Sequence, residues 1–139
     1  MHRATRMEVN LKNVKKNFRE IRRHIGQGPE IMGVIKADAY GHGAFEISRA
    51  LEEAGCRRFA VAIPDEALEL RERGVAAPIL VLGPTPERSA AEYVKRNVTA
   101  TITDLSFARA LDAEAAKQGK RAPVHVKVDT GMSRVGFFP

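Results

Sequence analysis

The feature that most constrains the fold is a regular alternation of short apolar segments with amphipathic segments along most of the chain. A first helix is expected over 11–25, and strands and helices then alternate until a final strand. The expected strands are 30–35, 58–63, 78–82, 98–102 and 123–128, and the helices between them are 44–54, 64–73, 87–96 and 105–118. Such alternation indicates a parallel sheet covered by helices.

The connections between these elements are short, and no Pro/Gly/Ser-rich linker divides the chain. Asn10 and Asp104 stand where side chains commonly cap helix starts, and Gly26 and Gly119 follow expected helix ends. The 139 residues therefore predict one α/β domain. Two architectures fit the order of elements: an open doubly wound sheet and a piece of an eight-stranded β/α barrel. The hydrophobic periodicity of the sequence does not distinguish between these two architectures.

The composition is that of a globular protein, with 44% hydrophobic and 29% charged residues and no apolar run of bilayer length. Met1–Met7 carries basic residues but no apolar core follows, so no secretion signal is expected. The one cysteine, Cys56, cannot form an internal disulfide. It fits the reducing cytoplasm, which is the expected location.

The net charge of +6 does not by itself indicate a nucleic-acid partner. Basic residues are mostly interleaved with acidic ones and lack an accompanying set of aromatic residues, so neither nucleic-acid nor membrane partners are expected. The densest basic patch has the spacing of a solvated helix face and comprises Lys12, Lys15, Lys16, Arg19, Arg22 and Arg23.

The first candidate site is Val34–Gly43, where an apolar strand runs into Lys36 and then into a loop with two glycines. Active sites of parallel α/β folds lie at the C-terminal ends of strands, so Lys36 is expected at such a site. A neutral lysine amine, which a partly desolvated pocket favours, forms a Schiff base with an aldehyde. The glycines precede a helix start, which attracts phosphate, and Tyr40 offers a hydroxyl to a phosphate oxygen. On these residues alone, the alternative is a strand-end lysine that reaches solvent.

The second candidate site is Val124–Phe137, whose first residues alternate between two faces of a strand. If the valines face the helices, Lys127 points into a barrel interior, where an ammonium needs a partner. Asp129 is one candidate partner. Carbamylation of Lys127 by carbon dioxide is another solution, because it turns a cation into an anion. The simpler alternative is a structural lysine paired with Asp129, with Arg134 on the surface.

Both segments resemble signature sequences of alanine racemases. Val34–Gly43 is similar to the stretch that carries the cofactor lysine, and 127–134 is similar to the family's lysine-aspartate-threonine-glycine-methionine-x-arginine pattern. The segments 59–70 and 79–83 also look like family segments. The resemblance covers nearly the whole chain. It implies a partial (β/α)8 TIM-like barrel of about five parallel strands, with residues 1–139 forming the N-terminal part of the barrel domain and the C-terminal β domain absent.

The resemblance also implies a cofactor and residue roles. Lys36 would carry pyridoxal 5'-phosphate and act as one of two catalytic bases, and Tyr40 would contact the cofactor phosphate. Lys127, carbamylated in many family members, would orient Arg134. Arg134 would bond the phenolic oxygen of the cofactor and help hold the substrate carboxylate. The resemblance implies no metal.

The implied reaction is the interconversion of L-alanine and D-alanine, which supplies D-alanine for peptidoglycan. In the family the enzyme is a homodimer, and the second base is a tyrosine from the partner's C-terminal domain. The tyrosines here are Tyr40 and Tyr93, and Tyr93 has the position of a packing residue. This fragment is therefore expected to be inactive alone, and its open sheet edges are expected to favour self-association. The alternatives are a serine or broad-specificity racemase, a non-catalytic pyridoxal-phosphate-binding barrel protein, and an interaction fragment without a ligand.

Overall fold

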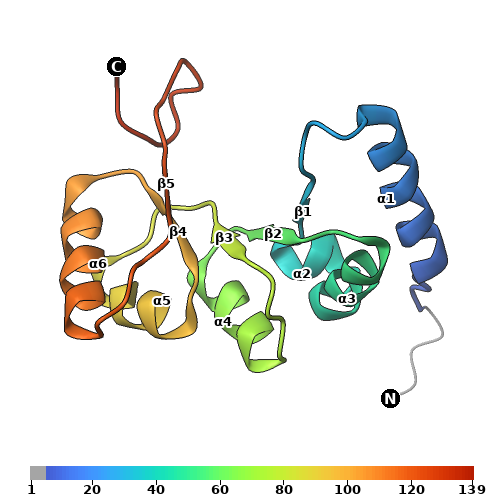
Figure 1. The fold of residues 1–139 in the computed structure, drawn as a ribbon, viewed down its shortest axis with the longest axis horizontal. Coiled ribbons are helices and arrows are strands. Elements are labelled where there is room, and N and C mark those ends of the chain that lie inside the picture. The colour runs from blue at the N-terminus through green and yellow to red at the C-terminus, as the bar shows by residue number, and fades with distance from the viewer. Residues whose placement is uncertain (1–5) are drawn as a thin grey trace.

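A parallel sheet of five strands organises the protein (Figure 1). The computed structural model describes residues 6–139. Residues 1–5, on which part of the expectation about a secretion signal rests, lie outside the described residues. The strands are β1 (Met32–Val34), β2 (Arg58–Val61), β3 (Ile79–Val81), β4 (Thr99–Ile102) and β5 (Val124–Val126). The helices are α1 (Leu11–Ile25), α2 (Lys36–Gly41), α3 (Ala44–Ala54), α4 (Pro64–Glu72), α5 (Ala90–Arg96) and α6 (Leu105–Lys117), with a 3-10 turn η1 (Glu87–Ser89) before α5.

The strand order decides between the two expected architectures. Each strand pairs in parallel with the next one along the chain, giving the order β1-β2-β3-β4-β5. A doubly wound sheet reverses its strand order at a switch point, whereas a β/α barrel adds strands in sequence. The barrel architecture is therefore confirmed as a five-stranded segment, and the doubly wound alternative is wrong. Within residues 6–139 the sheet is open, with β1 and β5 at its edges.

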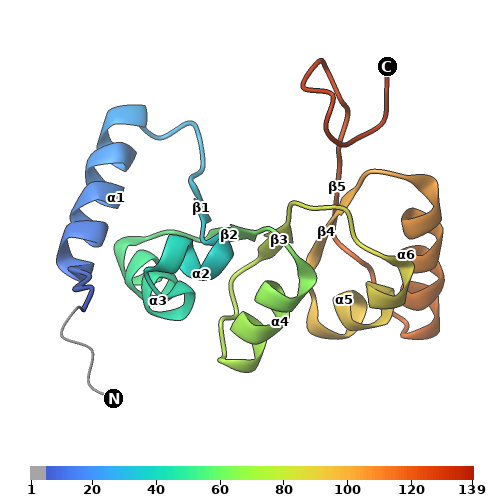
Figure 2. The same cartoon turned by 180° about the vertical axis from the view of Figure 1, so that it is seen from behind.

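The pairing register sorts the strand residues into two faces, because partners in parallel strands point to the same side. Phe59 pairs with Ile79, and Val81 pairs with Ala100; all four belong to the buried hydrophobic cluster. Figures 1 and 2 show α3, α4, α5 and α6 along one side of the sheet, which we call the helix-covered face. The strand residues that alternate with those of the buried cluster form the opposite face. They include Val34, Ala60, Leu80, Thr99, Thr101 and His125.

Most expected helices and strands are confirmed to within a few residues. The side chain of Asn10 accepts the N–H groups of Lys12 and Asn13, and the Asp104 carboxylate accepts the N–H of Phe107. These bonds satisfy backbone donors that a helix start leaves free, which is why α1 and α6 begin where expected. The helix expected from residue 87 begins instead with η1, and each observed strand is shorter than expected by one to three residues.

Helix α1 lies at one end of the molecule and packs against α3 (Figure 1). Phe18 is its buried contact, and Lys15 forms an ion pair with Glu53 of α3. The expected basic face of this helix is exposed or half-buried, as a solvated face should be, while Ile21 on the apolar side is also 54% exposed. Among residues 6–139, no helix combines the length and apolarity that crossing a bilayer requires.

Candidate functional site

Lys36 directly follows Ile35 at the carboxyl end of β1, where the sequence predicted a reactive residue. Ile35 is buried in the hydrophobic cluster and anchors this strand end. The Lys36 side chain is half-buried. Within residues 6–139 its amine has neither a hydrogen-bond partner nor an ion-pair partner. The nitrogen is therefore available to an added molecule.

The segment after Lys36 is a left-handed helical turn rather than the expected loop. Ala37, Asp38, Ala39 and Tyr40 have φ angles of 49°, 52°, 53° and 58°. This region costs an L-residue about 1–2 kcal/mol because Cβ approaches the following carbonyl oxygen. Consecutive strained residues are typical of functional sites, where surrounding contacts hold them in place.

Hydrogen bonds at both ends hold this turn. The N–H of Ala39 donates to the carbonyl oxygen of Ile35 at 3.0 Å, and the N–H of Gly43 donates to that of Asp38 at 2.9 Å. The Asp38 carboxylate accepts the N–H of Ala44, the first residue of α3, at 2.6 Å. The start of α3, which the sequence suggested as a phosphate site, is therefore already occupied by a carboxylate.

Tyr40 and His42, the other polar side chains of this segment, differ in their hydrogen bonding. The ring of Tyr40 is on the surface, with 61% of the residue exposed, and its hydroxyl has no hydrogen-bond partner among residues 6–139. His42 Nδ1 lies 2.9 Å from the carbonyl oxygen of Ala39. Tyr40 is thus free to meet a ligand, while His42 takes part in the turn itself.

Glu66 contacts the turn from a different part of the chain and was not among the candidate site residues. Its Oε1 accepts the N–H of Ala37 at 2.5 Å, and its Oε2 accepts the N–H groups of Ala62 and Ile63 at 2.7 and 3.1 Å. A glutamate three positions after a helix start commonly bonds backbone near that start, so its position after Pro64 could have suggested the second pair of bonds. No sequence signal indicates the bond to Ala37.

Lys127 lies on the face opposite the helices, as the alternation predicted. Val124 and Val126 are in register with Ala100 and Ile102, which belong to the buried cluster on the helix-covered face. Lys127 is therefore directed to the other face, together with His125. The Lys127 side chain is half-buried, and its amine donates to the carbonyl oxygen of Val128 at 3.2 Å.

Asp129 does not form an ion pair with Lys127 within residues 6–139. Its Oδ1 instead accepts the N–H groups of Gly131 and Ser133, each at 3.0 Å. These bonds, led by the one from Ser133, hold the pKa of the Asp129 carboxyl below its usual value, and the nearby charge of Lys127 adds to the effect. The carboxylate thus orders the following loop and does not neutralise the charge of Lys127.

Arg134 is exposed on a loop whose two ends are joined. Phe137 donates its N–H to the carbonyl oxygen of Lys127 at 2.9 Å and accepts the N–H of Asp129 at 2.8 Å. Gly136 has a φ of 121°, and a Cβ there would lie 2.8 Å from the carbonyl oxygen of Lys127, so this closure requires glycine. Arg134 is therefore presented by an ordered loop with its guanidinium in solvent.

The structure does not bring the two candidate segments into contact. Lys36 and Tyr40 follow β1, whereas Lys127 and Arg134 follow β5, and these strands are the two edges of the sheet (Figure 1). Both segments nevertheless follow the carboxyl ends of parallel strands. In a β/α barrel those ends meet at one rim, which is where its active sites lie.

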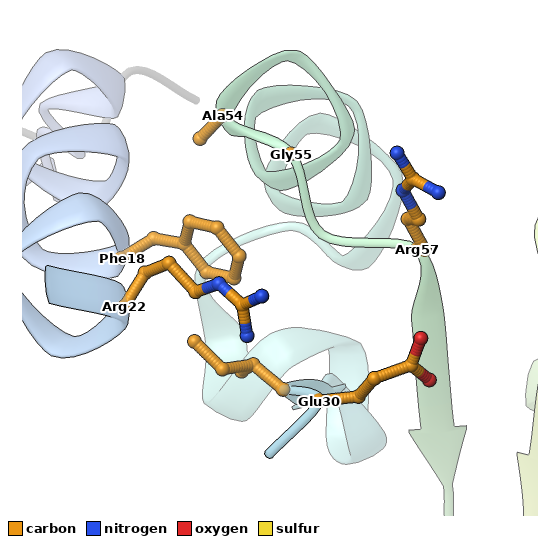
Figure 3. A pocket seen from close by; sticks show the side chains of 7 residues that line it. Phe18, Arg22, Glu30, Ala54, Gly55 and Arg57 are labelled. Carbon is orange, nitrogen blue, oxygen red and sulfur yellow. The ribbon is translucent and has the colours of Figure 1, made fainter. Parts of the chain in front are cut away.

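A cavity of about 410 Å³ lies at the other ends of the strands, next to α1 (Figure 3). Glu30 and Arg57 on its wall precede β1 and β2, so it lies on the amino side of the sheet. Two of its charged groups already have partners: Arg22 donates to the carbonyl oxygen of Pro29, and Glu30 pairs with Arg58. In the part of the chain that the structure describes, no cluster of three His, Cys, Asp or Glu residues could hold a metal ion. The carboxyl side, with Lys36, is therefore the candidate active site.

Sequential parallel strands, helices on one face and reactive side chains at the carboxyl ends define a segment of a β/α-barrel enzyme domain. The family model described as "Alanine racemase, N-terminal domain" matches residues 9–139. The chain belongs to this family.

Individual relatives agree with the family. Alanine racemase 2 of Caldanaerobacter subterraneus subsp. tengcongensis is 50% identical over 135 residues, which are 97% of this chain and 35% of that protein. The structure of alanine racemase from Clostridium difficile 630 superposes with a TM-score of 0.84 at 40% identity, covering 93% of this chain and 33% of that one. A histidine racemase from Leuconostoc mesenteroides subsp. sake gives a TM-score of 0.83 at 37% identity, covering 92% and 34%. The chain thus spans about a third of the length of the relatives it matches.

Proposed function

We propose that this chain is the lysine-bearing part of a pyridoxal-phosphate-dependent racemase that interconverts L-alanine and D-alanine in the cytoplasm and supplies D-alanine for peptidoglycan. The observation that carries the proposal is the half-buried amine of Lys36 at the carboxyl end of β1, which has no partner within residues 6–139. The alanine racemases among its relatives support the choice of substrate. The complete enzyme is proposed to be a homodimer, with 1–139 as the N-terminal part of its barrel domain.

The residues present fit a cofactor that carries an aldehyde and a phosphate. An unpaired amine is what covalent attachment to an aldehyde requires. The free hydroxyl of exposed Tyr40, four positions along a turn held by hydrogen bonds, can donate to a phosphate oxygen. The exposed guanidinium of Arg134 can donate to a phenolic oxygen or a carboxylate.

Each candidate residue then has a role in the reaction. The bound cofactor supplies an electron sink for cleavage of the bond between Cα and hydrogen. Lys36 holds a proton at Nζ on one side of the substrate, and Tyr40 fixes the phosphate end. Arg134 orients the substrate carboxylate. Lys127 has no acidic partner within residues 6–139. Its neutral amine would combine with carbon dioxide and release a proton, and the resulting carbamate, with one negative charge, could accept a hydrogen bond from Arg134.

Inversion of a carbon centre needs a second base on the other side, and Tyr93 cannot supply it. Tyr93 is 1% exposed, and burial raises its pKa to about 12, so it stays neutral and inaccessible. We therefore propose that the second base comes from elsewhere in the complete enzyme, and that this chain alone racemises alanine poorly. The histidine racemase among its structural relatives supports keeping a broader or different amino-acid substrate as the alternative.

The test is to add pyridoxal phosphate, reduce with borohydride and map the modified peptide. We expect the label on Lys36 and none in the Lys36→Ala variant, with Lys12→Ala on exposed α1 as the control. A chain that binds no ligand would show no preferred lysine, and that result would overturn the proposal. Exchange of the alanine Cα proton by a chain extended through the C-terminal domain separates a racemase from a protein that only binds the cofactor.

A further inference from the structure

The peptide bond that follows Lys36 is held by a side chain distant in sequence. The N–H of Ala37 belongs to that peptide and donates to Oε1 of Glu66, which is 29 positions later in the chain. The other oxygen of Glu66 bonds the N–H groups of Ala62 and Ile63, at the end of β2 and the start of α4. One carboxylate therefore ties the backbone beside Lys36 to the neighbouring strand end.

We propose that Glu66 is a positioning residue for Lys36. It fixes the peptide from which the lysine side chain departs and so sets where the amine is presented and how readily it reacts. This inference rests on the proposed role of Lys36, and Glu66 itself need not touch cofactor or substrate.

The conformation of the turn explains why such a clamp is needed. Ala37 is the first of the four residues with left-handed φ angles, an arrangement that an isolated L-chain disfavours. Asp38 bonds the far side of the turn through Ala44. On the near side, Glu66 bonds the N–H at which the chain leaves Lys36. Without that bond, the Lys36–Ala37 peptide can rotate toward ordinary geometry and carry the amine with it.

The chemistry of the clamp requires a carboxylate. All three partners of Glu66 are N–H donors, and two oxygens without hydrogens can accept from all of them. A glutamine has one oxygen and one NH2 group, so one side would set a donor against a donor. The carboxylate also lies in the first turn of α4, where negative charge is favoured.

The experiment compares Glu66→Gln with Glu69→Gln. Glu69 lies on the same helix, and both glutamates line a second cavity, at the carboxyl side, whose wall also includes Asp38 of the turn. The Glu69 carboxylate has no hydrogen-bond partner within residues 6–139, so this variant controls for the loss of one charge. The first readout needs no cofactor: trace acetylation with acetic anhydride across a pH series gives the reactivity and apparent pKa of the Lys36 amine relative to other lysines. The second readout is the rate of borohydride-trapped labelling of Lys36 by pyridoxal phosphate.

We expect Glu66→Gln to change Lys36 acetylation and its pH profile, to slow trapped labelling by about ten-fold or more, and to speed hydrogen exchange at Ala37. Glu69→Gln should behave as the unmodified chain, and Glu66→Asp should be intermediate. An unchanged Lys36 profile in a folded Glu66→Gln variant overturns the inference. If the variant unfolds, Glu66→Asp decides in the same way. If the unmodified chain acetylates normally but never labels Lys36 with pyridoxal phosphate, the proposed function fails while the acetylation series still tests Glu66.

Discussion

The phenol oxygen of Tyr93 lies 2.8 Å from the hydroxyl oxygen of Thr85, in the interior between α5 and the loop after β3. Tyr93 also meets the ring of Phe107 edge-on, with centroids 5.7 Å apart. The pair joins a loop to two helices, and this contact makes Tyr93 a structural residue.

Tyr93→Phe should keep the ring contact and lose the hydrogen bond, lowering the free energy of unfolding by about 1 kcal/mol at neutral pH. Burial raises the pKa of Tyr93 to about 12, against 10.0 for an ordinary tyrosine. The neutral phenol therefore stabilises the fold fully below pH 10, and this contribution is lost between pH 10 and about 12, as the unfolded chain ionises first. Urea unfolding across this range should show the difference between the two proteins changing only above pH 10. A constant difference would contradict this account.

Arg71 should be the most sensitive charged residue for stability. Its half-buried guanidinium donates to four carbonyl oxygens, and burial lowers its pKa. The acceptors belong to Val75, Ala77, Arg96 and Asn97. Arg71→Met leaves these oxygens without their donor and should cost about 2–4 kcal/mol in the free energy of unfolding. Arg71→Lys should retain only part of this stability, because an ammonium lacks the planar set of N–H donors with which a guanidinium reaches several oxygens. Exposed Arg88→Lys is the control and should stay within about 0.5 kcal/mol in urea melts.

The loop that follows Asp129 should become less ordered when the Asp129 carboxylate is protonated. Its pKa is lowered chiefly by the N–H groups of Ser133 and Gly131, so the ionised form stabilises the loop above the ordinary carboxyl pKa. That contribution is lost as the pH falls through the lowered pKa. Proton resonances of these two amides should titrate in that range. Asp129→Asn, which keeps an oxygen acceptor, should abolish the titration but keep slow amide exchange, whereas Asp129→Ala should speed exchange across the loop.

Lys127 should bind carbon dioxide if its missing partner is a carbamate. Nuclear magnetic resonance with isotope-labelled bicarbonate should show a carbamate carbon that is absent from Lys127→Ala and present in the exposed control Lys117→Ala. A spectrum identical in all three proteins would leave the simple amine bonded to Val128 as the correct state.

The strand edge at β5 should promote self-association. Val124 and Val126 are 45% and 65% exposed there, and an unpaired edge can add a strand from another chain. Sedimentation should detect concentration-dependent association, which Val126→Lys should weaken and which Met7→Lys, another exposed apolar position, should leave unchanged. A monomer at all concentrations would contradict this expectation.

Lys36 and Glu66 show which parts of the candidate site could be predicted from the sequence and which could not. The apolar run before Lys36 is a local pattern, so both the strand and the lysine at its end could be predicted. The left-handed turn could not be, because Ala37 and its neighbours have no local preference for positive φ. The turn depends on Asp38 and on Glu66, and the second contact crosses 29 positions that no periodicity relates.

The second segment shows the same division. The alternation of valines with Lys127 correctly predicted its face, because period two is built into any strand. Asp129, one of the two solutions considered for the charge of Lys127, bonds the backbone of its own loop instead. Arg134 could be placed after the strand but not related to Lys36, because the sheet separates them by three strands.

Neighbouring residues of one strand lie on opposite faces of the sheet, so substitutions at them have different consequences. Along β4, Ile102 packs under the helices while its neighbour Thr101 lies on the other face, where its hydroxyl donates to the carbonyl oxygen of Val81 at 2.6 Å. Adjacent residues of β4 thus meet different requirements, one from packing under the helices and the next from contacts on the opposite face. Substitutions on one face of the sheet can therefore occur without disturbing the side chains that pack on the other.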